Sequence, residues 1–322
     1  MRTAIPLTVL VTGLACSLFT ASAQARARVF VASYGNDSNP CTFGSPCKTF
    51  QQAVNVVDPN GEVTAIDSAG FGPISINGKS VTITSPAGVE AGIAAPAPGT
   101  AAITINGPAI VNLSGLTLDG AHVANSTGIS LSGAGGFLTV RDCVIRNFGQ
   151  DGIDFHTDGG GGVLSVSNTV VSDNGNTGIA YYPSGTINVA SVTLNRVEMR
   201  NNSKYGFFLW GSLSTPPLNT PMSLTASVFE STVSGSLLAG LYALTTLNNS
   251  FVDIELFHSV VTANGVGLLA EGYGIISVAN SNVTANVWDW QGPNNGLVQS
   301  YGDNYSFNNV NSSGAMHPVP RN

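Results

Sequence analysis

The sequence is dominated by a repeated template between Leu138 and Trp210. Each copy has two apolar residues at alternate positions, two spacer residues, a small and an apolar residue at alternate positions, and then a polar turn and a Gly-apolar pair. The copies begin at Leu138, Leu164 and Val192 and end in Gly152–Ile153, Gly178–Ile179 and Gly206–Phe207. Alternation buries one face of a strand, and such a short unit buries that face only by stacking on its neighbours. The repeat therefore predicts stacked turns of a parallel β-helix.

The same spacing extends beyond these three copies. A glycine before an apolar residue opens the third strand of each predicted turn, at Gly128, Gly152, Gly178, Gly206, Gly240 and Gly267. Such intervals are typical of solenoids, whose repeats span about 20–50 residues. We predict one all-β solenoid over residues 61–290 and an irregular tail over residues 291–322. The longest interval contains the Pro-rich residues 213–221, which we expect to form a loop on the side of the column.

Several polar residues recur at fixed positions inside the template. Three residues after the last apolar position of the second strand stand Asn174, Asn202, Asn264 and Asn286. Stacked Asn side chains at a sharp turn can bond to the backbones of neighbouring turns, so we predict a structural ladder. Cys143 occupies an inward position that other turns fill with Thr169, Val197, Ser231, Ser259 and Ser281. We therefore expect a buried, inert thiol rather than a nucleophile.

Residues 1–25 have the features of a bacterial secretory signal. Arg2 precedes an apolar run from Ala4 to Leu14, and small residues ending in Ala23 and Ala25 form a cleavage pattern. No later segment reaches transmembrane length. The sequence therefore predicts a signal peptide over residues 1–25 and a secreted or periplasmic protein. A membrane anchor and a lipoprotein signal at Cys16 are the weaker alternatives.

Residues 26–60 are predicted to cap the column. A short strand at Val29–Val31 precedes a loop, and Phe50, Ala53, Val54 and Val57 then recur at helical spacing. An amphipathic helix here would cover the open end of the first turn. Cys41 and Cys47 flank the loop, and an oxidising compartment favours a disulfide between them. A metal site is the alternative, but no further His or Cys lies nearby.

Two segments at this end resemble a known family. The runs Gly35-Asn-Asp-Ser-Asn-Pro-Cys41, Pro46-Cys-Lys-Thr-Phe50 and Asp67-Ser-Ala-Gly-Phe-Gly-Pro73 are similar to the start of secreted bacterial right-handed β-helix proteins of the pectate-lyase-like superfamily. The resemblance covers essentially the whole chain after the signal. It implies a right-handed parallel β-helix, and it implies little about the reaction because many members have no assigned activity.

Charge excludes one class of partner. Only 9% of the residues are charged and the formal net charge is −7. A surface of this kind does not attract phosphate backbones, so we expect no nucleic-acid binding. It also repels acidic sugars unless a cation bridges them.

The outward positions of the third strands predict an aromatic strip. If the residue after each glycine points inward, the second and fourth residues point outward, and adjacent turns stack about 4.8 Å apart. The strip then consists of His156, Tyr182, Trp210, Phe208 and Tyr242. Flat rings suit the apolar faces of sugars, so Tyr182, Phe208, Trp210 and Tyr242 are candidate substrate-binding residues. The alternative is that the 213–221 loop covers the strip as a satellite core.

Asp154, His156 and Asp158 share the outward side beside this strip. Asp154 and His156 would lie about 6.5–7 Å apart at Cα, and the three side chains suit acid–base catalysis or the binding of a metal ion such as calcium. No other cofactor is indicated. Gly152, Asp154 and His156 also resemble the Asp-Pro-His-Asp motif of β-helical alginate epimerases, which implies proton transfer at C5 of a sugar. The sequence departs from that motif at Asp151, Phe155 and Asp158, which puts this role in doubt. A surface turn with no catalytic part is the alternative.

Two functions follow from these features. The first is an exported protein that binds and processes a polysaccharide or cell-surface glycan along the aromatic and Asp-His face, as a lyase, epimerase or hydrolase if it is catalytic. The second is a non-catalytic surface or matrix protein with a structural or adhesive role. It is favoured by the sparse charge and by the absence of a complete catalytic motif.

Overall fold

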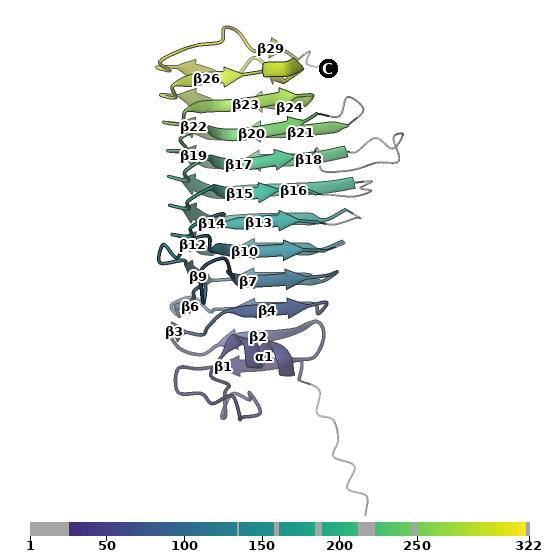
Figure 1. Ribbon diagram of the computed structural model, residues 1–322, viewed down its shortest axis with the longest axis vertical. Coiled ribbons are helices and arrows are strands. Elements are labelled where there is room, and N and C mark those ends of the chain that lie inside the picture. Colours follow the sequence, from purple (N-terminus) through teal and green to yellow (C-terminus); the bar gives the residue numbers. More distant parts are fainter. Residues whose placement is uncertain are drawn as a thin grey trace, which may run out of the picture.

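The computed structural model describes residues 26–133, 135–157, 161–183, 189–211, 223–246 and 250–319. The predicted signal peptide, Asp158 and the 213–221 loop lie outside these residues. The described chain forms one column of stacked turns, with the N-terminal cap at one end and the last turns at the other (Figure 1). Every strand pairing among the described residues is parallel, for example Ile129 with Ile153 and Ile153 with Ile179.

The third strands of successive turns form a nine-stranded sheet. This sheet carries the predicted aromatic strip. In chain order its strands are β4 (Ile74–Asn77), β7 (Ala101–Asn106), β10 (Thr127–Ser132), β13 (Ile153–His156), β15 (Thr177–Tyr181), β17 (Tyr205–Trp210), β20 (Ala239–Thr245), β23 (Val266–Gly272) and β26 (Trp288–Gln291).

The first and second strands of the turns form a twenty-stranded sheet. Its strands are β1 (Arg28–Val31), β2 (Gly61–Ala65), β3 (Ala69–Gly70), β5 (Val81–Thr84), β6 (Ala91–Ile93), β8 (Ile110–Ser114), β9 (Leu116–Asp119), β11 (Phe137–Arg141), β12 (Val144–Arg146), β14 (Val163–Ser172), β16 (Val189–Arg200), β18 (Ser223–Phe229), β19 (Thr232–Ser234), β21 (Phe251–Phe257), β22 (Val260–Thr262), β24 (Gly274–Ala279), β25 (Asn282–Thr284), β27 (Leu297–Ser300), β28 (Tyr305–Phe307) and β29 (His317–Pro318).

A single residue with positive φ makes the corner between the first and second strands of a turn. In β14 and β16 this residue is Asn168 (φ 48°) or Arg196 (φ 53°), and the strand continues through the corner. Asp142 and Asn280 hold the same conformation in other turns. One left-handed residue reverses the alternation of side chains, so apolar residues on both sides of the corner can point inward.

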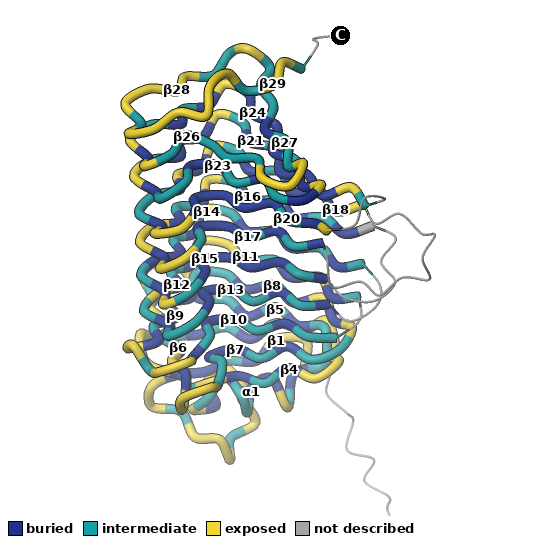
Figure 2. The backbone as a smooth tube through the Cα atoms, turned by 45° about the horizontal axis from the view of Figure 1, so that its top comes forward, coloured by how far each residue is buried: buried dark blue, intermediate teal, exposed yellow. Residues whose placement is uncertain are grey.

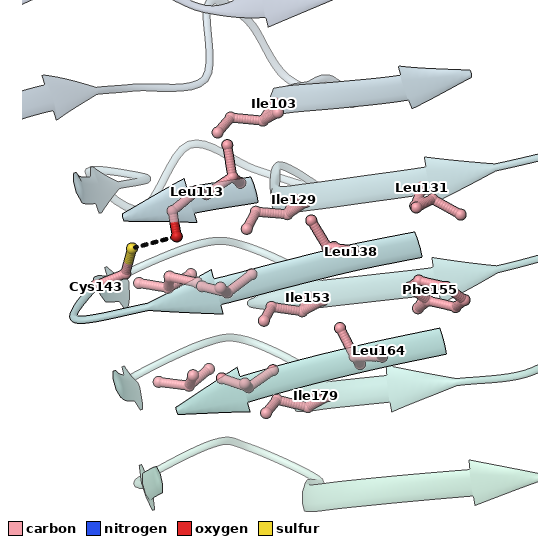
Figure 3. Packing of buried hydrophobic residues seen from close by; sticks show 14 of the residues in the cluster. Ile103, Leu113, Ile129, Leu131, Leu138, Cys143, Ile153, Phe155, Leu164 and Ile179 are labelled. Atoms are coloured by element: carbon pink, nitrogen blue, oxygen red, sulfur yellow. Dashed lines mark hydrogen bonds between the residues drawn. The ribbon is translucent and has the colours of Figure 1, made fainter. Parts of the chain in front are cut away.

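Inward apolar side chains fill the column along its length. Buried residues line its interior, and exposed residues lie mainly at the two ends and at the turns (Figure 2). Ile129, Ile153 and Ile179 stack in one file from successive third strands, with Phe155 in a neighbouring file (Figure 3). The interior is close-packed, so the chemistry of this protein must lie on outward side chains.

Polar ladders run beside the apolar files and confirm the predicted Asn stack. The Asn202 side chain accepts hydrogen bonds from the backbone and side-chain nitrogens of Asn174, at 3.3 and 2.9 Å. Asn286 accepts from Asn264 in the same way, at 2.9 and 3.0 Å. Cys143 is buried as expected, its backbone N–H donates to Thr169 Oγ1 at 3.3 Å, and burial raises the pKa of its thiol to about 11.

The N-terminal segment has the predicted helix and disulfide. Helix α1 (Phe50–Val56) begins after Thr49, whose side chain accepts from Gln52 N at 3.2 Å. Phe50 is fully buried and lies 5.0 Å from the ring of Phe71. Cys41 and Cys47 form a disulfide. The helix lies at the end of the column beside β1 and β2 (Figure 1).

The predicted boundary at residue 290 is too early. β27 pairs with β24, and β28 pairs with β25, so the column continues into the segment expected to be irregular. Two asparagines continue the ladders there: Asn309 Oδ1 accepts from Asn286 N at 2.9 Å, and Asn304 Oδ1 accepts from Ser281 N at 2.9 Å. Apolar residues become scarce in this segment, and polar ladders continue the stacking. No helix in the described part of the chain is long and apolar enough to cross a membrane.

Candidate functional site

The outer face of the nine-stranded sheet places the predicted site residues in two neighbouring columns. Strand register aligns Asp154 with Ser130 on one side and Ala180 on the other. Phe208 and Tyr242 continue that column. These pairings confirm the alignment expected from the glycine spacing.

The rings on this face touch one another in sequence. Tyr182 lies next to β15, and its backbone N–H donates to Phe155 O at 3.1 Å, which brings its ring beside His156. Centroid distances are 5.2 Å for His156–Tyr182, 6.4 Å for Tyr182–Trp210, 6.0 Å for Trp210–Phe208 and 4.8 Å for Phe208–Tyr242. The aromatic strip is therefore continuous over four turns, from β13 to β20.

Tyr205 is a further member of the strip that the sequence pattern missed. Its ring lies 5.3 Å from that of Phe208 and 5.0 Å from that of Tyr242. Tyr205 stands directly before a third-strand glycine, a position outside the two columns that alternation predicted. An aromatic residue where other turns have Thr177 or Ala239 is the signal that could have found it.

The strip is less open than expected. Tyr182, Phe208 and Trp210 are half-buried, and Tyr242 is only 7% exposed. The Tyr242 hydroxyl donates to Glu271 Oε2 at 2.6 Å, and its ring packs against Tyr205 and Phe208. Tyr242 thus supports the other rings, and its prediction as a direct sugar contact is weakened. Phe208 and Trp210 remain the accessible rings beside Tyr182.

Asp154 lies at the polar end of the strip. Burial raises the pKa of Asp154, while the adjacent Tyr182 hydroxyl and the neighbouring His156 lower it. Burial and the charge of Asp154 raise the pKa of Tyr182, so this phenol stays protonated. Asp154 Oδ1 is buried and has no hydrogen-bond partner among the described residues.

A second carboxylate, Asp151, lies in the turn before β13. Its Oδ1 accepts from Thr177 N at 2.9 Å and from Asn176 Nδ2 at 2.8 Å. Burial raises the pKa of Asp151 to about 6, and the charge of Asp154 adds to this effect. In the sequence pattern, Asp151 stands out only as a departure from the epimerase motif. Its bonds tie it to the next turn, so it holds the entry to β13 and couples electrostatically to Asp154.

The structure describes two of the three residues of the expected site, Asp154 and His156. Asp154 and His156 lie on the same side of β13, with Tyr182 beside both. Asp158 falls outside the described residues. Within the part of the chain that the structure describes, no three His, Cys, Asp or Glu side chains are grouped to hold a metal ion.

A cavity lined by both polar and apolar residues continues the face beyond Asp154. It has a volume of about 470 Å³, and Gln51, Ser75, Thr104, Thr127 and Ser130 contribute to its lining. Ser75, Thr104 and Ser130 are register partners on β4, β7 and β10, and Ser130 pairs with Asp154. The outer face therefore runs from hydroxyl groups through Asp154 to aromatic rings.

Comparison with known proteins supports this fold. Residues 66–220 match the family model of the right-handed β-helix region. The chain therefore folds as a right-handed parallel β-helix. Among solved structures it is similar to the pectate lyase Pel9A, with a TM-score of 0.54 and 14% identity over 91% of this chain and 78% of that chain. At such low identity the similarity concerns the fold alone.

Looser similarities link it to two further enzymes. A rhamnogalacturonan lyase aligns with a TM-score of 0.49 and 13% identity, over 84% of this chain and 75% of that chain. Pectin methylesterase PemA from Erwinia chrysanthemi aligns with a TM-score of 0.46 and 11% identity, over 91% and 92%. No curated protein matches the sequence.

Proposed function

We propose that this protein is exported and binds a polysaccharide along the outer face of its nine-stranded sheet. The observation that carries the proposal is the run of touching rings from His156 to Tyr242, which begins beside the half-buried Asp154 carboxylate. Half-buried aromatic faces bind the apolar faces of sugar rings, and polar groups beside them fix orientation. The similarity of the fold to a pectate lyase is consistent with a carbohydrate ligand.

The polar end of the strip is the proposed place of reaction. Asp154 has a raised pKa and an oxygen without a partner among the described residues, which suits proton transfer to or from a bound sugar. Tyr182 lies beside the Asp154 carboxylate and stays protonated because its pKa is raised, so it can donate a hydrogen bond to the ligand but is a poor source of a proton. His156 is the second proton carrier in this proposal. The alternative function is a non-catalytic surface or matrix protein, in which the strip serves adhesion or packing.

A glycan-binding measurement tests the proposal. Wild-type protein should bind at least one glycan of a plant and bacterial polysaccharide panel, and Trp210→Ala should weaken that binding roughly 10-fold or more, about the contribution of one stacked ring. Phe137→Ala is the matched control, because Phe137 is an exposed aromatic residue on the other sheet. If neither the wild type nor the control binds any glycan, the proposed function is wrong.

Turnover of the bound glycan tests the role of Asp154. Asp154→Asn should lower the rate by roughly 100-fold or more, because general acid–base groups contribute about 10²–10⁴, and binding should persist. His156→Gln should have a comparable effect. The products of a time course, measured by mass spectrometry, report the rate. Undiminished turnover in the double variant would show that the reaction occurs elsewhere, and binding without turnover in the wild type would favour the adhesive alternative.

A further inference from the structure

The charged residues of the outer face indicate which kind of ligand it can bind. The nine strands of this sheet contain no Lys or Arg among the described residues. They do contain two outward carboxylates, Asp154 on β13 and Glu271 on β23. The carboxylates lie on either side of the accessible rings, so a ligand that follows the strip meets negative charge at both ends and no strand-borne positive charge.

Three basic side chains of the described chain are engaged away from this face. Arg146 pairs with Asp119 at 2.9 Å, and Arg196 pairs with Glu230 at 3.2 Å, both on the twenty-stranded sheet. Lys79 donates to the carbonyl groups of Val54 and Val57 at the N-terminal cap. Lys204 is the basic residue closest in sequence to the face, since it immediately precedes β17. Because Lys204 could attract an acidic ligand to the face, the test below includes a Lys204 variant.

The unpartnered polar atoms on the face have opposite hydrogen-bonding characters. Asp154 Oδ1 is an acceptor when ionised, and Trp210 Nε1 is a donor, and both are buried without a partner among the described residues. A sugar hydroxyl satisfies either, because it donates and accepts. The cavity beyond Asp154 continues this pattern with the hydroxyl groups of Ser75, Thr104 and Ser130.

We propose that this face selects an uncharged polysaccharide and rejects polyuronates. The inference rests on the proposed function and specifies its ligand. Every unit of a polyuronate carries a carboxylate, so some of these groups would lie beside Asp154 and Glu271. The half-buried protein groups there reduce the screening of charge by solvent, which strengthens the repulsion. Recognition of such carboxylates normally uses Arg or Lys, which these strands lack. A neutral glycan meets only rings and hydroxyl-compatible partners there.

Calorimetric binding to the full chain at low ionic strength tests the inference. One arm uses neutral hexasaccharides of the glucan, mannan, xylan and galactan types, and the other uses oligogalacturonate and oligomannuronate of equal length. Each arm is run with EDTA and with CaCl₂, so that bridging by a cation is detected. At least one neutral ligand should bind roughly 10-fold or more tightly than either oligouronate under both conditions.

Two variants sharpen the result. Glu271→Gln keeps an acceptor for Tyr242 and removes a charge, so it should increase the affinity for oligouronates. Lys204→Ala should leave their weak binding unchanged, and thermal unfolding checks that each variant is folded. Oligouronate binding as tight as neutral binding, with or without calcium, would overturn the inference and leave the proposed function standing. Absence of binding to both classes would overturn the proposed function, and the inference with it.

Discussion

At the scale of single residues, a carboxylate is buried at a strand position that alternation directs outward. Asp253 occupies an outward position on β21, yet it is only 6% exposed. Its carboxylate accepts two long hydrogen bonds from Ser277 Oγ, at 3.3 and 3.4 Å. Burial raises the pKa of Asp253 to about 7, and the charge of Glu255 adds to this rise.

This raised pKa makes stability depend on pH. The pKa of Asp253 in the folded state exceeds the value of about 4 expected in the unfolded chain. Its contribution to stability is therefore complete below about pH 4 and is lost as the pH rises through about 7. Asp253→Asn, which carries no charge, should raise the melting temperature by roughly 2–4 °C near pH 8 and change it little near pH 4.

Thermal unfolding of the variant at the two pH values measures this effect. Asp142→Asn is the matched control, because Asp142 is an exposed carboxylate on the same sheet surface and its left-handed conformation suits Asn. An equal shift for Asp253→Asn at both pH values would show that its carboxyl is not the source of the pH dependence.

At the scale of the elements, hydrogen-bonded ladders hold one turn on the next. The Asn ladder has one interruption, at Ser236 between Asn202 and Asn264. Ser236 is buried, and its hydroxyl has no partner among the described residues. Gly178 and Gly240 face an Asn side-chain nitrogen at 2.7 and 2.9 Å from the position of an added Cβ, whereas Gly206 faces Ser236 Oγ at 3.5 Å. Ser236 therefore stops short of the place that the Asn amide takes in the neighbouring turns, with Val233 Cγ1 at 2.3 Å from the added Cβ at Gly206.

Completing the ladder should stabilise the column. Ser236→Asn is expected to raise the free energy of unfolding by about 1 kcal/mol, the net worth of one or two buried hydrogen bonds. Ser236→Ala serves as the control and should be nearly neutral, because the backbone N–H of residue 236 keeps its bond to Asn264 Oδ1 at 2.9 Å. Urea unfolding gives both values. A destabilised Asn variant would mean that the side chain does not fit beside Gly206.

At the scale of the whole molecule, the stacking of successive turns joins the cavity and the aromatic rings into one extended surface. The outer face of the nine-stranded sheet joins the cavity near α1 to the rings of β15, β17 and β20. Each turn contributes only one or two outward residues to this face. Their combination follows from parallel pairing in register, which brings residues about 25 positions apart in sequence to about 4.8 Å from each other.

Much of this architecture was predictable because its signal repeats. The apolar alternation, the glycine before each third strand and the recurrent Asn positions predicted the parallel β-helix, the ladder and the column from Ser130 to Tyr242. The cap helix and the Cys41–Cys47 disulfide were also predicted. The end of the column was misplaced, since Asn304 and Asn309 continue its ladders where apolar residues become scarce.

The sequence by itself therefore determined the repeat, its register and the residues that face outward, because a strand's alternation and a solenoid's period are local properties of the chain. The tertiary structure alone decided how each outward residue is used. It buries Tyr242 against Glu271, brings Tyr205 into the strip and joins Tyr182 to Asp154. These outcomes depend on which side chains meet between turns, and on how much water they exclude, and no periodic pattern encodes either.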